Sequence, residues 1–118
     1  NLLENARRYG QPAAGTPADE AAVRLVIGVQ PDSPATVGEQ SRPAIAVVAV
    51  EDRGPGVPAE LRERIFEPFY RLPGASEREG GVGLGLSLVR SIALRHHGQV
   101  RCEDRPGGGA RFVLELPL

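Results

Sequence analysis

The sequence predicts a single α/β domain, a two-layer sandwich in which helices cover one face of a mixed, mostly antiparallel sheet. Its 118 residues suffice for one hydrophobic core, whereas chains split into separate domains only beyond about 250 residues. Stretches with the apolar pattern of strands are interspersed with stretches of helical periodicity, which favours a sheet with helices packed on it. The last two strand-like stretches are separated by a short Gly-rich turn, as in an antiparallel hairpin.

The first half of the chain predicts one helix and two strands. Residues 1–10 have the pattern of a helix that ends at a glycine cap, and because the chain starts inside this pattern we expect a domain truncated at its N-terminus. Apolar residues alternate over 23–29 and predict a strand. The continuous apolar run 44–50 is typical of a strand covered on both faces. Two Pro-, Gly- and Ala- or Ser-rich stretches are predicted loops: residues 11–21 and 31–43.

The second half predicts two helices and a C-terminal hairpin. A short helix is expected over 59–66 and a longer one over 84–97, followed by Gly98. In the longer helix, one stripe holds Leu84, Leu88 and Ile92, with Val89 and Ala93 beside it. A strand over 99–103 and a turn over 105–109 follow. On the last strand, the inward residues are Phe112, Leu114 and Leu116, and the outward ones are Arg111 and Glu115.

Composition excludes several kinds of protein. The formal net charge is −1, whereas a dedicated nucleic-acid binder usually has a basic face. All 14 basic residues are Arg, which excludes mechanisms that need a lysine ammonium. The single cysteine, Cys102, excludes an internal disulfide and fits a reducing compartment such as the cytoplasm. No run of 18 apolar residues and no signal-peptide pattern is present, so we expect no direct membrane insertion.

Polar residues of the N-terminal helix form the first candidate site. Asn1, Asn5 and Arg8 share one face, and Tyr9 lies four positions after Asn5. An amide oxygen suits Mg²⁺, a guanidinium pairs with phosphate, and a tyrosine ring can lie against a base. The same pattern also describes an ordinary amphipathic helix with its polar side in water.

The turn after the second strand forms the second candidate. The Asp52 carboxylate can accept a hydrogen bond from an exocyclic amine, which adenine carries at C6 and guanine does not. Gly54 and Gly56 remove side chains where a flat ring must approach the backbone. Because Asp, Gly and Pro also form ordinary turns, a plain turn remains the alternative.

A Gly-rich run before the long helix forms the third candidate. Free N–H groups and the helix dipole at such a helix start bind anions, so we expect phosphate contact. The run does not follow a strand, and the chain has no lysine for a Walker A loop. A flexible loop is the alternative. The residues concerned are Gly81, Val82, Gly83, Leu84, Gly85 and Leu86.

The remaining candidates have simpler interpretations. Phe66 and Phe69 are interpreted as core anchors. Arg71 opens a polar loop, where it contacts a phosphate or is solvated. His96 and His97 end a helix, where a histidine favours the dipole and needs no other role.

Taken in order, these blocks resemble the catalytic ATP-binding domain of bacterial sensor histidine kinases, a branch of the gyrase, chaperone, histidine kinase and mismatch-repair ATPases with the Bergerat fold. Residues 1–9 resemble its N box and residues 52–56 its first glycine box. Residues 65–71 match its F box, and residues 81–86 its second glycine box. Four such blocks in the right order are a specific signal.

The resemblance implies a role for each block. Asn5 would coordinate Mg²⁺, Arg8 would lie near the phosphates, and Tyr9 would flank the adenine. Residues 71–83 would form the ATP lid. The other implied contacts are Asp52 to the adenine amine, Gly54 and Gly56 along the ring, Arg71 to the γ-phosphate, and Gly81, Gly83 and Gly85 on the phosphate side.

The implied reaction is transfer of the γ-phosphate to a histidine on a separate dimerisation domain, with a response regulator downstream. Hydrolysing relatives place a Glu four residues before the Mg²⁺ Asn, and here that position is Asn1. The last glycine turn carries Ala110 where many relatives have Thr or Ser, so one polar support for the adenine end is missing. The phosphoacceptor histidine is absent from the sequence.

Two other functions remain open at this point. One is a serine kinase of the anti-sigma-factor type, which shares the fold. The other is a degenerate module that binds a partner without nucleotide. Many kinases of the resembled family are anchored in the inner membrane with this domain in the cytoplasm, which is where we expect this chain.

Overall fold

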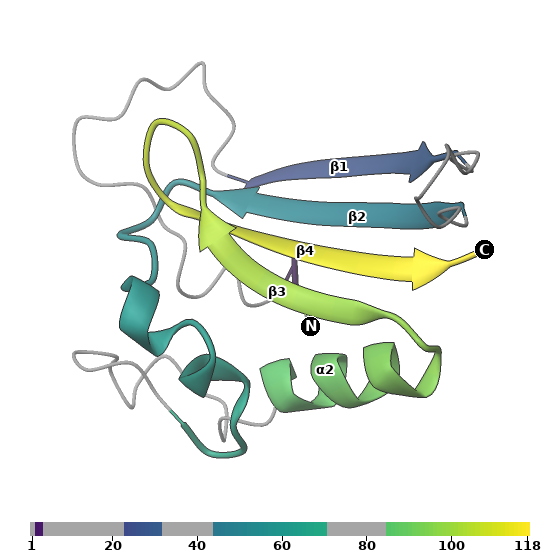
Figure 1. Cartoon of the computed structure of the whole chain (residues 1–118). Coiled ribbons are helices and arrows are strands. Elements are labelled where there is room, and N and C mark those ends of the chain that lie inside the picture. The colour runs from purple at the N-terminus through teal and green to yellow at the C-terminus, as the bar shows by residue number, and fades with distance from the viewer. Residues whose placement is uncertain (1, 4–22, 32–43, 71–84) are drawn as a thin grey trace, which may run out of the picture.

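The computed structural model describes residues 2–3, 23–31, 44–70 and 85–118, and these build one antiparallel sheet with helices on one side (Figure 1). The sheet has the strand order β1-β2-β4-β3, and all three pairings between these strands are antiparallel. Its elements are β1 (Val23–Gln30), β2 (Ile45–Asp52), the 3₁₀ helices η1 (Ala59–Leu61) and η2 (Arg64–Phe66), α2 (Gly85–Arg95), β3 (Gln99–Asp104) and β4 (Ala110–Pro117). The predicted fold class is therefore confirmed.

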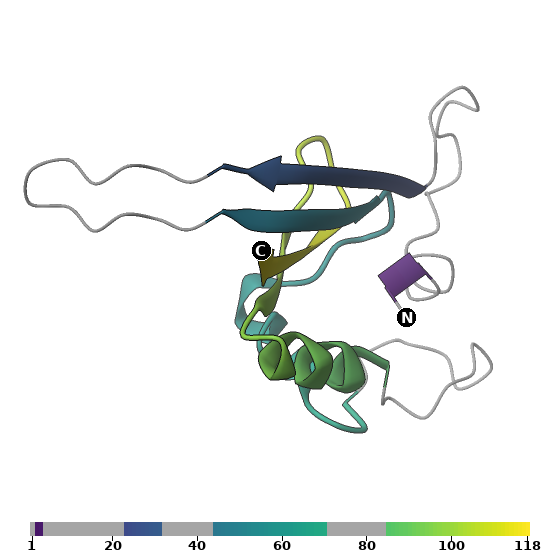
Figure 2. The same ribbon diagram turned by 90° about the vertical axis from the view of Figure 1, so that its right-hand side faces the viewer.

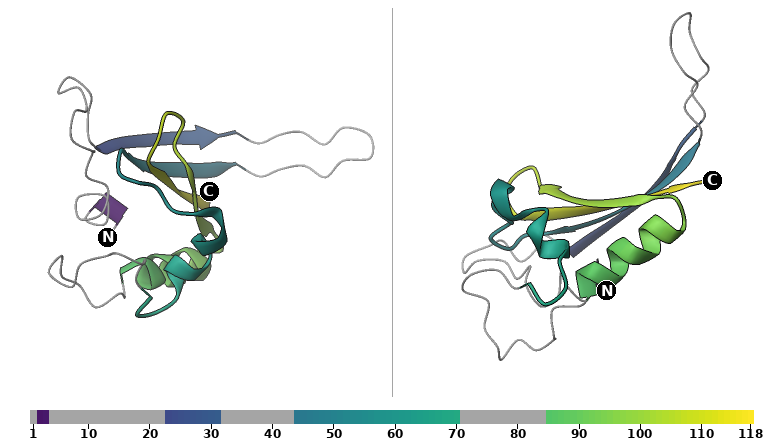
Figure 3. Two further views of the ribbon diagram at one scale, coloured as in Figure 1. Left: turned by 90° about the vertical axis from the view of Figure 1, so that its left-hand side faces the viewer. Right: turned by 60° about the horizontal axis from the view of Figure 1, so that its bottom comes forward.

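The inner face of the sheet, toward α2 and the 3₁₀ helices, carries the core (Figure 3). The register aligns Val50, Phe112 and Cys102 across β2, β4 and β3, and each is less than 9% exposed. The ring of Phe66 from η2 packs edge-to-face on Phe112, with the ring centroids 6.3 Å apart. The predicted inward orientation of Phe112 is confirmed, and this row joins three strands to the helical layer.

Strand β2 is covered on both faces only in its second half. Ala49 to Asp52 are buried, whereas Ile45 to Val48 are half-buried. On the outer face Ala49 lies opposite Val113 of β4, and both are 0% exposed. The expectation of cover along the whole strand was therefore wrong for its first half, because α2 contacts β3 and β4 instead.

The inner face of β1 is left open by the described elements. Leu25 is 49% exposed, Ile27 70% and Val29 63%, although all three alternate as predicted. Figure 2 shows why: α2 covers the part of this face near β3 and lies away from β1. Among the described residues, Leu2 packs against this side of the core, in one cluster with Val50.

The predicted short helix over 59–66 is replaced by two 3₁₀ turns. The Leu61 N–H donates to the Pro58 carbonyl at 2.9 Å, and the Phe66 N–H donates to the Glu63 carbonyl at 3.3 Å. Glu67 is extended, with ψ at 140°, as the residue before a proline must be. Pro68 disfavours helical geometry at Glu67, and the segment before it forms short 3₁₀ turns.

Phe69 corrects the interpretation of the two aromatic residues as core anchors. Phe66 is 5% exposed and in the core, but Phe69 is 70% exposed. Phe69 also has a φ of 66°, a left-handed conformation that is unusual for a bulky residue. The turn over residues 67–70, closed by the Tyr70 N–H donating to the Glu67 carbonyl at 3.2 Å, therefore separates two side chains that a continuous helix would have placed on one face.

Helix α2 packs through a different stripe from the first one predicted. Ala93 is buried, and Leu86 and Val89 pack against the core, whereas Leu88 is 51% and Ile92 47% exposed. Leu84 lies outside the described residues. No helix in the described part of the chain is long and apolar enough to cross a membrane.

The end of α2 is a Schellman motif built on a histidine. The Gly98 N–H donates to the Ala93 carbonyl at 2.8 Å, and the His97 N–H donates to the Leu94 carbonyl at 3.1 Å. His97, with a φ of 60°, takes the left-handed position that is usually a glycine. Gly98 serves close packing instead, because a Cβ there would lie 2.1 Å from the Glu115 carbonyl oxygen of β4.

Candidate functional site

Asp52 is a buried carboxylate at the last position of β2, 5% exposed. Its Oδ1 accepts hydrogen bonds from the backbone N–H of Gly54 at 3.0 Å and from that of Ala110 at 3.1 Å. A buried carboxylate is costly unless it is hydrogen-bonded, and these two donors meet that requirement. They also fix the orientation of the carboxyl group.

Two glycine turns interlock around this carboxylate. Gly56 in the turn after β2 has a φ of 77°, and a Cβ there would lie 3.2 Å from the Gly109 carbonyl oxygen. Gly109 in the β3–β4 turn has a φ of 105°, and a Cβ there would lie 2.0 Å from the Asp52 carbonyl oxygen. Because the backbones of the two turns are in direct contact, only glycine fits at both positions.

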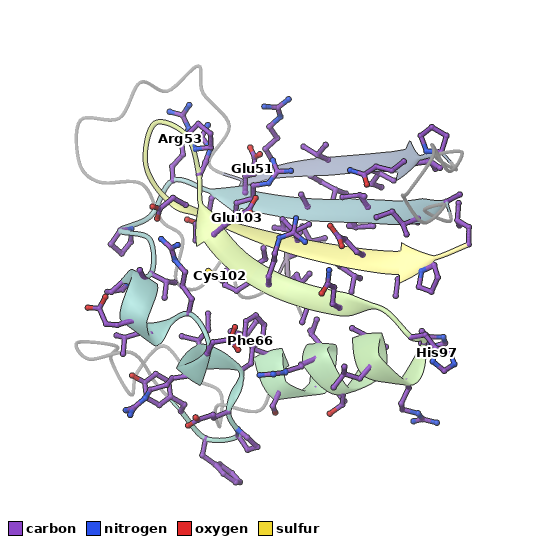
Figure 4. All side chains as sticks on the ribbon, viewed as in Figure 1. Glu51, Arg53, Phe66, His97, Cys102 and Glu103 are labelled. Atoms are coloured by element: carbon purple, nitrogen blue, oxygen red, sulfur yellow. The ribbon has the colours of Figure 1, made fainter. Side chains whose placement is uncertain are left out.

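The preceding carboxylate, Glu51, points to the opposite face of the sheet and is 6% exposed. It is surrounded by arginines: Nη1 of Arg111 donates to its Oε1 at 2.5 Å, Nε of Arg105 lies 3.7 Å from its Oε2, and Nη1 of Arg24 lies 3.9 Å from the same oxygen. Figure 4 shows Glu51 and Glu103 on this charged outer face and Cys102 and Phe66 between the sheet and the helices. The charge of Glu51 is thus neutralised by cations of the outer face, whereas Asp52 is held by backbone dipoles.

The network of ion pairs continues across the outer face. Oε1 of Glu103 lies 2.9 Å from Nε of Arg111, and Arg101 pairs with both Glu103 and Glu115. Hydrogen bonds from Gln99, which has the larger effect, and from Arg101 hold the pKa of Glu115 below its ordinary value. On the inner face, burial raises the pKa of the Cys102 thiol to about 11, which keeps it protonated at neutral pH.

A cavity of about 550 Å³ lies next to the interlocked turns, and its lining includes Gly56, Gly109, Arg62 and Asp104. Arg62 closes one side, because its Nη2 lies 2.7 Å from Oδ1 of Asp104 and its Nε donates to the Val57 carbonyl at 3.3 Å. Asp52 is not among the lining residues. This hollow is therefore lined by the two glycine turns and by residues of η1 and β3, and not by the carboxylate itself.

The structure describes five of the predicted site residues: Asp52, Gly54, Gly56, Gly85 and Leu86. The first three form the turn just described. Gly85 begins α2 with open space around its Cα, and the Leu86 side chain packs against the core, so only the backbone of this pair is available to a ligand. The other predicted residues lie outside the described residues: Asn1, Asn5, Arg8, Tyr9, Arg71, Gly81, Val82, Gly83 and Leu84.

Sequence reasoning missed the contribution of the β3–β4 turn. Ala110 was noted only for the hydroxyl that it lacks, yet its backbone N–H is one of the two donors to Asp52. Three consecutive glycines, Gly107 to Gly109, all with positive φ, precede it. That run of glycines was the available signal in the sequence, because consecutive glycines allow a turn with positive φ angles that other residues disfavour.

Comparisons with known proteins show the family of the chain. A family model described as histidine kinase-, DNA gyrase B- and HSP90-like ATPase matches residues 1–118, the whole chain. Sensor histidine kinase GtrS of Pseudomonas aeruginosa is 40% identical over 98% of this chain and 24% of its own length. The chain spans no more than about a quarter of the length of the curated relatives that it matches.

Two solved structures extend the likeness to the fold. The mycobacterial sensor histidine kinase MprB has a TM-score of 0.64 at 27% identity, over 98% of this chain and 64% of that chain. Full-length ShkA in complex with AMPPNP has a TM-score of 0.50 at 32% identity, over 73% of this chain and 16% of that chain. The chain therefore belongs to the family of histidine kinase-, DNA gyrase B- and HSP90-like ATPases, and within that family it is similar to sensor histidine kinases.

Proposed function

We propose that the chain binds ATP with Mg²⁺ and donates the γ-phosphate to a histidine on a separate dimerisation domain of the same kinase. The observation that carries the proposal is the Asp52 carboxylate, buried at the end of β2 with Oδ1 held by two backbone donors. A carboxylate fixed in this way is a preorganised acceptor for an exocyclic amine such as that of adenine. The similarity to ShkA, whose structure holds AMPPNP, supports a nucleotide as the ligand.

The glycines of the turn complete the base side of the proposed site. Gly54 supplies a donor to Asp52, and Gly56 has a positive φ that a side chain would strain. A flat ring can therefore approach the backbone here without meeting a Cβ. Guanine presents an acceptor where adenine has its amine, so it would face the Asp52 carboxylate with a repulsive contact.

Apart from Gly85, the phosphate side of the proposed site rests on residues outside the described part of the chain. Asn5 would hold Mg²⁺, Arg8 and Arg71 would contact phosphates, and the run from Gly81 to Gly85 would supply backbone donors. The described residues contain no group of three or more His, Cys, Asp or Glu that could hold a metal ion. Mg²⁺, when bound, neutralises charge on the phosphate oxygens.

The proposed chemistry is positioning together with charge neutralisation. A nitrogen of the acceptor imidazole forms a bond to the γ-phosphorus while the bond to the β–γ bridging oxygen breaks, and ADP leaves. The chain orients the base through Asp52 and the phosphates through its arginines, so that the γ-phosphate lies in line with the acceptor. A response regulator as the next acceptor and a cytoplasmic location are parts of the same proposal.

The test is calorimetric titration of the 118-residue chain with ATP, with and without Mg²⁺, beside GTP and the Asp52→Asn variant. The side-chain amide that this substitution introduces presents a donor as well as an acceptor, so we expect ATP affinity to fall at least about tenfold in a variant that remains folded by circular dichroism. Binding of GTP as tightly as ATP, or no binding by the folded chain, would contradict the proposal. The phosphorylated product formed with a histidine-bearing dimerisation domain should be acid-labile, whereas a serine kinase would give an acid-stable product.

A further inference from the structure

We propose that Gly109 is a positioning residue for the nucleotide site: its backbone, packed directly on Asp52, sets where the carboxylate that accepts the adenine amine is held. The inference deepens the proposed function and rests on it. Gly109 acts through Asp52 and is not itself a contact to the nucleotide.

The first observation is the closeness of the two backbones. A Cβ at position 109 would lie 2.0 Å from the Asp52 carbonyl oxygen, 2.8 Å from its carbonyl carbon and 3.0 Å from the Cα of Arg53. All three of these neighbours are backbone atoms, which cannot rotate away as the end of a side chain can. Any side chain at 109 therefore has to displace the peptide group between Asp52 and Arg53.

The second observation is that the next residue holds the Asp52 side chain. The Ala110 N–H donates to Oδ1 of Asp52 at 3.1 Å. Gly109 and Ala110 thus fix the backbone and the carboxylate of the same residue from one turn. A shift of Gly109 moves both contacts together, which is why a distant turn can control the geometry of the acceptor.

The third observation is that the β3–β4 turn is itself anchored. The Arg105 N–H donates to the Gly109 carbonyl at 3.1 Å, and the Gly108 N–H donates to the Arg105 carbonyl at 3.0 Å. The Arg105 side chain is 15% exposed, donates to the Gly108 carbonyl at 3.2 Å, and lies 3.7 Å from Glu51. The turn is therefore tied to β2 on the outer face as well as on the inner one.

The neighbouring glycine provides a matched control. Gly108 has a φ of 111°, close to the 105° of Gly109, but a Cβ at Gly108 would have nothing within 4 Å. An alanine at either position incurs the strain of a similar positive φ, and only an alanine at 109 collides with Asp52. The difference between the two variants therefore isolates the contact from the cost of a positive φ.

The experiment measures ATP affinity by calorimetry and the thermal midpoint for Gly109→Ala and Gly108→Ala, each alone and combined with Asp52→Asn. We expect Gly109→Ala to weaken ATP binding at least about tenfold more than Gly108→Ala does. In the Asp52→Asn background this extra loss should disappear, because two changes that act through the same group are not additive. Equal losses from the two glycine variants, or an extra loss that persists in the Asp52→Asn background, would overturn the inference.

A second variant covers the case in which Gly109→Ala does not fold. Ligation at Cys102 allows a synthetic segment 102–118 in which the Ala110 amide is replaced by an ester. This change removes the donor to Asp52 and adds no atom to the turn. We expect weaker ATP binding that is again absent in the Asp52→Asn background, and unchanged ATP affinity of the ester chain would contradict the inference.

The outcomes also separate the inference from the proposed function. If the unaltered chain, folded by circular dichroism, binds no ATP, the proposed function fails and the inference fails with it. If the chain binds ATP and loses it with Asp52→Asn, but Gly109→Ala behaves as Gly108→Ala does, only the role assigned to Gly109 is refuted.

Discussion

Glu51 and Arg111 face each other across β2 and β4, and Nη1 of Arg111 donates to Oε1 of Glu51 at 2.5 Å. Asp52, one residue later, points to the other face and is bound by backbone donors. Two consecutive buried carboxylates thus have different partners. Glu51 balances the arginines of the outer face, whereas the Asp52 carboxylate lies on the inner face, where we propose that it accepts the adenine amine.

Glu51→Gln should destabilise the domain by about 1–3 kcal/mol, because three arginines lose their buried counter-charge while remaining partly solvated. Urea denaturation at neutral pH measures the change. Glu103→Gln is the control, since the Glu103 side chain is 40% exposed and its pairs should contribute less than about 1 kcal/mol. Equal losses from both variants would contradict the central place given to Glu51.

Glu115 should make stability depend on acid pH. Its folded-state pKa is lowered by hydrogen bonds from Gln99 and Arg101, so its contribution is fully present above the ordinary value of 4.5 and is lost as pH falls through the folded pKa. When the pH is lowered from about 5 to about 2, we therefore expect the thermal midpoint of Glu115→Gln to fall less than that of the unaltered chain. Parallel pH profiles for the two chains would contradict this role of Glu115.

Phe69→Asn should raise the free energy of unfolding by up to about 1 kcal/mol. Asparagine adopts the left-handed conformation at lower energy than phenylalanine does. Because the Phe69 side chain is 70% exposed, its removal takes away little buried surface. Chemical denaturation provides the measurement. Phe66→Ala, at a core position, should instead cost about 3–5 kcal/mol. A destabilising Phe69→Asn would show that the Phe69 ring makes contacts that its exposure does not suggest.

His97→Gly and Gly98→Ala should change stability in opposite directions. Glycine at 97 has no Cβ and so removes the strain of the left-handed conformation of His97. This should stabilise the domain by about 1 kcal/mol. Alanine at 98 places a Cβ against the Glu115 carbonyl and should destabilise by several kcal/mol, on the order of an overpacked core site. Thermal midpoints of the two variants test this, and similar midpoints would exclude the Schellman assignment.

The strands could be predicted from the sequence because their apolar patterns record burial directly. The alternation over 23–29 and the apolar run 44–50 predicted the strands Val23–Gln30 and Ile45–Asp52 to within two residues at each end. The same pattern could not show that Ile27 would be 70% exposed, because alternation states which side chains share a face and not what covers that face. Nor could it separate an α-helix from two 3₁₀ turns between Pro58 and Pro68.

The sequence predicted Asp52, Gly54 and Gly56 as the base side of the candidate site. This was possible because the carboxylate of Asp, and the lack of a side chain in Gly, follow from the residue type. The support from Gly109 and Ala110 was not predicted, because it is made by backbone atoms 57 and 58 positions along the chain. A backbone N–H is present in almost every residue, so the three glycines before Ala110 could mark an unusual turn but not which N–H reaches Asp52. Only the close approach of the two turns makes these atoms specific.

The position of β4 has a consequence for synthesis. It lies between β2 and β3 in the sheet, yet it is the last strand along the chain. On a ribosome, β1 and β2 emerge before β3 and β4, and a two-stranded hairpin without further strands is marginal in water. The second donor to Asp52 does not exist until residue 110 has left the exit tunnel. The apolar residues of β2 must therefore avoid wrong partners until β4 has been synthesised.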